Sequence, residues 1–184
     1  MTLDELRTEF ERSSRRSMSM PIAGAIVWAV VAVLSLLLEY RFSLIATFFC
    51  TGAILPIAIV VAKLRGEELL SNKNPFAKLM GMSALMVNLL WALHIPLFLY
   101  APQFVPLSLG IGLGLHWVVY SWIIQHPLGT LHAVLRTVLI VLAWFVFAEQ
   151  RLTAISLVVI SMYLLTLHQM SSREISCLQE ANGS

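Results

Sequence analysis

Six long runs of apolar residues constrain the fold of this chain more than any other feature. Each run is about twenty residues long, the length that an α-helix needs to cross a hydrocarbon layer of about 30 Å. Strands of a membrane barrel would instead show short alternating segments. The sequence therefore predicts an all-α integral membrane bundle of six transmembrane helices. The expected spans are 18–38, 42–62, 79–100, 103–125, 128–148 and 152–170.

The composition agrees with a chain that lies mostly in lipid. Hydrophobic residues make up 59% of the 184 residues and charged residues 12%. A soluble domain keeps about a quarter of its residues charged, because polar side chains must cover its core. With only two cysteines, Cys50 and Cys177, the chain is not a disulfide scaffold. The net charge of +2 predicts no nucleic-acid partner.

Lysine and arginine fall almost entirely on one side of the predicted bundle. With six spans, both chain ends share a side with the loops after the second and fourth spans. That side receives ten of the 12 basic residues, Arg136 included, and the other side receives only Arg41 and Arg151. Since loops rich in Lys and Arg stay in the cytoplasm, we expect both termini to be cytoplasmic.

The chain divides into a charged leader, a transmembrane domain and a polar cytoplasmic tail, at 1–17, 18–170 and 171–184. In the leader, Thr2 and Glu5 fit a capping box, and apolar residues follow at helical spacing. These features predict a short amphipathic helix over residues 2–16. Such a helix lies against anionic lipid at the cytoplasmic face in one interpretation and docks a partner protein in the other.

Proline and glycine mark places where the spans depart from regular helices. Pro56 and Pro96 leave the carbonyls of Gly52 and Ala92 without their usual donors, so we expect kinks there. In the fourth span, the glycines at 110 and 114 form a small-xxx-small pattern that lets a neighbouring helix approach closely.

Arg136 is the one charged residue expected deep within a span. It lies about 12 Å from the cytoplasmic end of 128–148 at the helical rise, and His132 precedes it by one turn. An ionisable group in the bilayer is costly unless it is paired or hydrated, and no Asp or Glu falls near the centre of a span. A buried guanidinium would need a bound anion, a lipid headgroup or water. In the alternative, Arg136 extends along its apolar stem to the inner interface.

Several other polar residues fall near mid-membrane by residue counting. They either converge on Arg136 in one pocket or each bond a neighbouring helix, which is the more frequent use of a lone polar residue in a span. These residues are Thr51, Asn88, His116 and Ser161. The candidate ligand-binding residues are Arg136, His132, His116 and Asn88.

The sequence carries no catalytic motif and predicts no cofactor. Paired intramembrane aspartates, His-Glu-x-x-His, Gly-x-Ser-x-Gly, a P-loop and Cys-x-x-Cys are all absent. Three histidines near the cytoplasmic side, His126, His132 and His168, have no acidic or cysteine ligands beside them and no His-x-x-x-His spacing. We therefore predict no metal site.

The leader motif LDELR at 3–7 and the opening of the first span, PIAGAIVW at 21–28, resemble small uncharacterised membrane proteins of bacteria. The resemblance covers the whole chain in layout. It implies a multi-pass protein of the bacterial inner (plasma) membrane, and it carries over no activity.

Three functions are compatible with these features. The first hypothesis is a carrier or channel-like binder of a small solute, an anion being one candidate, with a cytoplasm-facing pocket around Arg136. The alternative is a structural or regulatory membrane subunit that docks a partner through its leader and the 63–78 loop. The third is an intramembrane enzyme with His116 or His132 as acid or base. Beyond lipid and a small ligand, a homo-oligomer is also compatible with the sequence.

The topology can be tested with cysteines introduced at Tyr40 and Gln150, in a background without Cys50 and Cys177. We expect a membrane-impermeant thiol reagent to label both positions from the periplasm, because both lie in outer loops. A cysteine at Asn72, in the 63–78 loop, serves as the control and should react only after permeabilisation. Labelling of positions 40 and 150 from the cytoplasm alone would overturn the topology.

Overall fold

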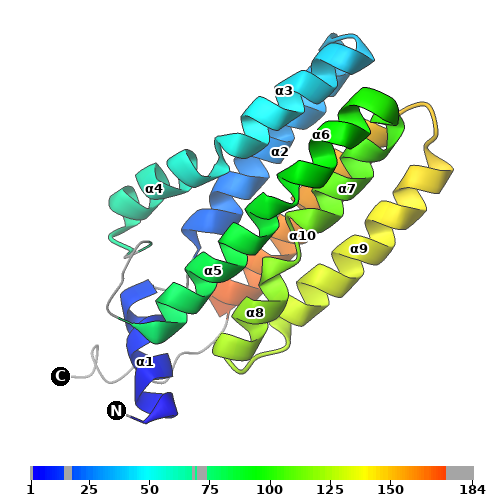
Figure 1. Ribbon diagram of the computed structural model, residues 1–184. Coiled ribbons are helices and arrows are strands. Elements are labelled where there is room, and N and C mark those ends of the chain that lie inside the picture. Colours follow the sequence, from blue (N-terminus) through cyan, green and yellow to red (C-terminus); the bar gives the residue numbers. More distant parts are fainter. Residues whose placement is uncertain (1, 15–17, 68, 70–73, 173–184) are drawn as a thin grey trace.

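The computed structural model describes residues 2–14, 18–67, 69 and 74–172, and every regular element in these ranges is a helix (Figure 1). The α-helices are α1 (Leu3–Ser14), α2 (Ser19–Leu37), α3 (Tyr40–Gly52), α4 (Ile54–Arg65), α5 (Pro75–Leu89), α6 (Trp91–Tyr100), α7 (Val105–Gly112), α8 (His116–Ile123), α9 (Leu128–Val146) and α10 (Arg151–Ser172), with a 3₁₀ helix, η2 (Pro102–Phe104), before α7. The tail 173–184 lies outside the described residues.

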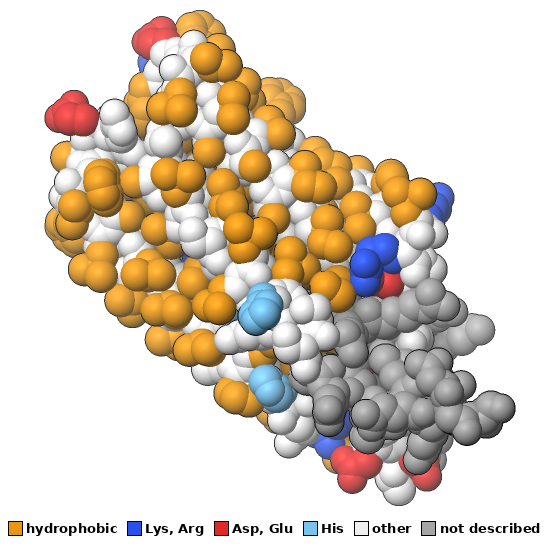
Figure 2. All heavy atoms as spheres, turned by 180° about the vertical axis from the view of Figure 1, so that it is seen from behind, with side chains coloured by type: hydrophobic (Ala, Val, Ile, Leu, Met, Phe, Trp, Pro, Cys, Tyr) orange, Lys and Arg blue, Asp and Glu red, His pale blue; other side chains and the backbone are white. Residues whose placement is uncertain are grey.

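Six helical stretches are long and apolar enough to cross a membrane, which confirms the predicted all-α bundle. They are Ser19–Leu37, Tyr40–Arg65, Pro75–Tyr100, Pro102–Ile123, Leu128–Val146 and Arg151–Ser172. Figure 2 shows hydrophobic side chains over the middle of one face and charged side chains toward its two ends. This distribution is that of a surface made for lipid with polar ends.

The helix ends on either side of the connection between the second and third spans lie outside the expected span limits, and local sequence explains both. α4 runs to a cap at Gly66, whose φ of 65° is left-handed and favours glycine. α5 begins at Pro75, and the side chain of Asn74 caps it by accepting from the N–H of Phe76 at 2.9 Å. The connection between α4 and α5 is therefore shorter than the expected 63–78 loop. Hydropathy places span ends at the last apolar residues, so it leaves out the polar turns with which α4 ends and α5 begins.

The second, third and fourth spans are each interrupted, whereas the first, fifth and sixth are continuous helices (Figure 1). The second divides at Ala53, where the carbonyl of Gly52 meets Pro56, a residue without an N–H. The kink predicted there is confirmed. The third divides at Leu90, and α6 continues through Pro96, so this break lies earlier than the proline predicted. The fourth divides between α7 and α8.

The helices pack around an antiparallel pair, α2 and α10. At one end of the pair, the hydroxyls of Ser35 and Thr153 lie 2.8 Å apart. Further along, Gly24 lies so close to Tyr163 that a Cβ there would be 2.5 Å from the ring. α9 contacts α10 and also the interrupted fourth span.

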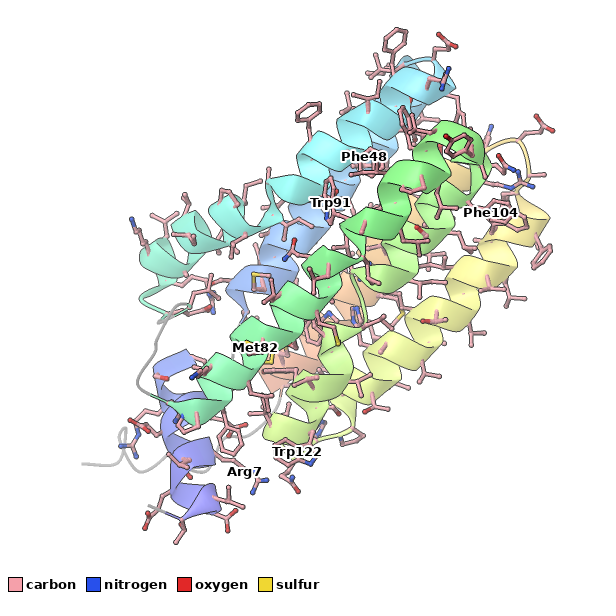
Figure 3. All side chains as sticks on the ribbon, in the orientation of Figure 1. Arg7, Phe48, Met82, Trp91, Phe104 and Trp122 are labelled. Atoms are coloured by element: carbon pink, nitrogen blue, oxygen red, sulfur yellow. The ribbon has the colours of Figure 1, made fainter. Side chains whose placement is uncertain are left out.

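Aromatic side chains join the interrupted second and third spans. The ring of Phe48 in α3 lies 5.3 Å from Trp91 and 5.7 Å from Phe98, both in α6 (Figure 3). These contacts lie just beyond the breaks at Ala53 and Leu90. They therefore hold the two half-helices α3 and α6 against each other.

The leader helix α1 packs against the end of its own bundle. Its capping box is confirmed, since Thr2 N–H donates to Glu5 Oε2 at 2.8 Å and Glu5 N–H to Thr2 Oγ1 at 3.3 Å. Arg7 lies over the rings of Phe76 and Trp122, at 5.5 and 5.6 Å (Figure 3). It also donates to the carbonyl of Ile123 at 3.2 Å. The leader is thus fixed to α5 and α8.

Close packing of α8 on α9 depends on Gly129, and this yields a stability prediction. A Cβ at Gly129 would collide with the backbone carbonyl of Trp117 and lie 2.9 Å from the backbone nitrogen of Ser121. We expect Gly129→Ala to destabilise the protein by about 1–3 kcal/mol, because the two helices must separate. Thermal unfolding of the purified protein in detergent measures the effect.

The matched control is Gly81→Ala in α5, where a Cβ would meet nothing within 4 Å. That substitution should leave the melting temperature unchanged or raise it slightly, because alanine favours helix over glycine. Equal losses in both variants would contradict the packing assigned to Gly129.

Candidate functional site

Arg136 lies in the middle of α9 and points into the bundle. Its side chain is 0% exposed, and His132, one turn earlier, is 1% exposed. The guanidinium contacts α7, α9 and α10, and it does not extend to the end of the bundle. Of the two expectations for Arg136, the structure supports burial and not extension to the interface.

The break between α7 and α8 provides the strongest contact of Arg136. At this break, Gly114 N–H bonds to the carbonyl of Ile111 at 2.8 Å, so it does not serve the carbonyl of Gly110 as in a regular helix. Arg136 Nε donates to that carbonyl at 2.8 Å. Gly114 also admits the stem, since a Cβ there would lie 3.1 Å from Arg136 Cδ. Arg136 therefore caps the end of α7.

His132 holds a second guanidinium nitrogen. Its Nε2 lies 3.4 Å from Arg136 Nη1, and its Nδ1 lies 2.6 Å from Thr166 Oγ1 on α10. Because arginine only donates, Nε2 accepts, and the ring proton is on Nδ1 and donates to Thr166. The ring also stacks on Trp117, with centroids 4.5 Å apart. His132 is thus a neutral acceptor in a fixed orientation.

The third guanidinium nitrogen, Nη2, is buried without a hydrogen-bond partner, and so is Nε1 of Trp117. The guanidinium carbon lies 5.3 Å from the ring centroid of Tyr163. Within the described part of the chain, no carboxylate forms an ion pair with Arg136. We call Arg136, His132, Trp117, Tyr163 and Thr166 the Arg136 cluster. It contains one buried positive charge and two donor nitrogens without a partner.

The structure places the other two predicted site residues, Asn88 and His116, differently. Asn88 is exposed on α5 and donates to the carbonyl of Ala84 at 2.9 Å, one turn back on its own helix. The structure therefore does not bring Asn88 to Arg136. His116 is partly exposed at the start of α8, and its ring lies 5.7 Å from that of Trp117, at the edge of the cluster.

The remaining polar residues near mid-span also bond locally. Thr51 donates to the carbonyl of Thr47 at 2.8 Å, and Ser161 is exposed and donates to Leu157 at 2.9 Å. Each satisfies its hydroxyl within its own helix, so the two add nothing to the Arg136 cluster.

Sequence reasoning missed Trp117, Tyr163 and Thr166. Trp117 and Tyr163 look like ordinary apolar positions of a span, and Thr166 lies 30 residues after Arg136 on another helix. For the contact between Arg136 and the carbonyl of Gly110 the sequence does hold a signal. The glycines of the fourth span mark a place where a side chain can reach the backbone.

A metal site finds no support among the residues that the structure describes. No three His, Cys, Asp or Glu side chains there lie close enough to hold one ion. His126 and His168 are exposed, whereas His132 is buried against Thr166. These three histidines therefore do not form one ligand set.

Comparison with known proteins identifies a family but no characterised relative. No curated protein and no solved structure matches the chain. A family model described as a family of unknown function, DUF7010, matches residues 3–173. Since this match covers nearly the whole chain, the protein belongs to the DUF7010 family.

Proposed function

We propose that this membrane protein binds a small anionic solute at the Arg136 cluster and carries it across the bilayer. One observation carries the proposal: Arg136 is 0% exposed, lacks a carboxylate partner within the described residues, and keeps Nη2 unpartnered. An uncompensated charge in a low-dielectric interior is strongly destabilising. A bound anion supplies the missing charge and accepts the unused hydrogen bonds.

The interrupted spans support a carrier more than a static binder. In transporters, discontinuous helices bring polar backbone groups to the middle of the membrane and form the substrate site there. Here the break between α7 and α8 lies directly at Arg136, which bonds the freed carbonyl of Gly110. The short half-helices can also move separately, so that the site opens to one side at a time.

The docking alternative has less support in the described part of the leader and connecting segment. Phe10 is 6% exposed, and Asn74 donates to the carbonyl of Leu6 at 2.8 Å. Glu67 is buried, where it accepts from Ser19 N–H at 3.0 Å and from Arg65 Nε at 2.6 Å. These groups serve contacts within the chain, and a partner would have to displace them.

We also infer the orientation from charge. The ten-to-two distribution of Lys and Arg favours cytoplasmic termini in the inner membrane. Exposed basic residues at that end, such as Arg12, Lys63 and Lys78, favour contact with anionic lipid. The leader then lies on the cytoplasmic side.

A thermal-shift titration tests the function. Purified protein in detergent is titrated with sodium salts of small anions, at constant sodium and with gluconate as the replacement. At a concentration about 100-fold above Kd, a ligand raises the melting temperature of a protein of this size by about 5 °C or more. We expect at least one anion to give a saturable shift that Arg136→Gln abolishes, because glutamine retains donors for Gly110 but has no charge.

The control variant is Arg151→Gln. Arg151 lies over the ring of Trp144 at 4.2 Å, near the other end of α9 and outside the cluster. It should retain the full shift. Proteoliposomes loaded with the active anion then distinguish carriage from binding by anion efflux. If no anion gives a shift that depends on Arg136, the proposal is wrong.

A further inference from the structure

We infer that the Arg136 cluster selects a halide, chloride or bromide, over carboxylates and phosphates. This inference rests on the proposed anion site and specifies its ligand. The selectivity follows from which guanidinium nitrogens the protein itself occupies, from the single positive charge, and from the aromatic surroundings of the free donors.

The protein's own acceptors bond two of the three guanidinium nitrogens. Arginine grips carboxylate and phosphate through two neighbouring nitrogens, each donating to a different oxygen. In this cluster Nε donates to Gly110 and Nη1 to His132, which leaves only Nη2 unpartnered. Nε has a single N–H, so the edge formed by Nε and Nη2 is closed to an oxyanion. On the edge formed by Nη1 and Nη2, a two-nitrogen grip competes with His132 for Nη1. The remaining contact suits a ligand that accepts through one atom.

The two occupying contacts are costly to release. Gly110 has lost its helical donor at the break, so its carbonyl depends on Arg136 in an apolar interior. His132 is held from behind by Thr166 at 2.6 Å and by its stack on Trp117. An oxyanion that takes the two-nitrogen grip therefore competes with one of these partners for Arg136.

Charge and surroundings favour a weakly hydrated monovalent ion. Within the described residues, Arg136 is the only charged group in the cluster, and the neighbouring surfaces are the rings of Trp117, Tyr163 and His132. A divalent anion would retain an uncompensated charge in this interior. With few donors available, a strongly hydrated oxyanion also loses more hydration than the protein replaces.

Trp117 provides a second unpartnered donor nitrogen in the cluster. Its indole Nε1 is buried without a partner, and its ring stacks on the histidine that bonds Arg136. Indole N–H is a donor only, which suits a halide and adds no charge. We assign Trp117 to ligand binding together with Nη2 of Arg136.

The test compares affinities of the full-length protein for sodium bromide, chloride, acetate and phosphate, by calorimetry with gluconate as the background anion. We expect bromide and chloride to bind at least tenfold more tightly than acetate or phosphate. Tighter binding of acetate or phosphate overturns the inference but leaves the anion site intact. Absence of Arg136-dependent binding for every anion overturns the inference and the proposed function together.

Two variants test the residues individually. Trp117→Phe retains a ring for stacking on His132 but removes the N–H, and it should weaken halide binding about threefold to tenfold. Trp28→Phe is the matched control, because Trp28 is 0% exposed and its Nε1 is also unpartnered. No ring contact joins Trp28 to the cluster among the described residues, so its loss should not change halide affinity. Equal weakening in both variants overturns the assignment of Trp117.

The second variant reverses the selectivity. His132→Ala removes the acceptor that competes for Nη1, so that Nη1 and Nη2 can grip a carboxylate together. We expect the acetate-to-bromide affinity ratio to rise at least tenfold in folded His132→Ala protein. An unchanged ratio, with a melting temperature that shows the variant is folded, overturns the role of the occupied nitrogens.

Discussion

The hydrogen bond from Arg136 Nε to the carbonyl of Gly110 is the contact on which the centre of this bundle depends. A helix broken within lipid exposes backbone carbonyls, and each one without a donor is expensive. A lone guanidinium in the same place is expensive for the opposite reason, since it has donors without acceptors. The bond, 2.8 Å long, reduces both costs at once. Neither the break nor the buried charge is well explained without the other.

That contact also arranges the surrounding side chains. The bond to Gly110 sets the position of the guanidinium along α9, and His132, oriented by Thr166, sets its rotation. Gly114 provides the space that the stem needs. Three helices thus determine the direction in which Nη2 points. A site preorganised in this way spends little binding energy on ordering itself when a ligand arrives.

Much of the fold follows from the sequence, because the bilayer imposes strong length requirements. Six apolar runs predict six spans, and Pro56 predicts a kink from the loss of one N–H. The break in the fourth span contains no proline, and glycines alone do not specify it. Counting residues along a span also does not show which face of α5 turns toward the bundle. This is why Asn88 has the expected depth but faces outward and bonds its own helix.

The site was only partly predictable for the same reason. Arg136 and His132 are one turn apart on one helix, so their proximity is local and visible in the sequence. Trp117 and Thr166 reach them through tertiary packing, which depends on how α8 and α10 are placed. The leader shows the same limit. Its capping box is local, but its attachment to Phe76 and Trp122 depends on distant spans.

The attachment of the leader has a consequence for biogenesis. Arg7 is synthesised before the six spans, yet its partners in the bundle, Phe76, Trp122 and Ile123, belong to the third and fourth spans. The leader therefore cannot complete its docking until the fourth span has been synthesised. Its docking onto α5 and α8 is therefore a late step of assembly, which follows the placement of these membrane helices.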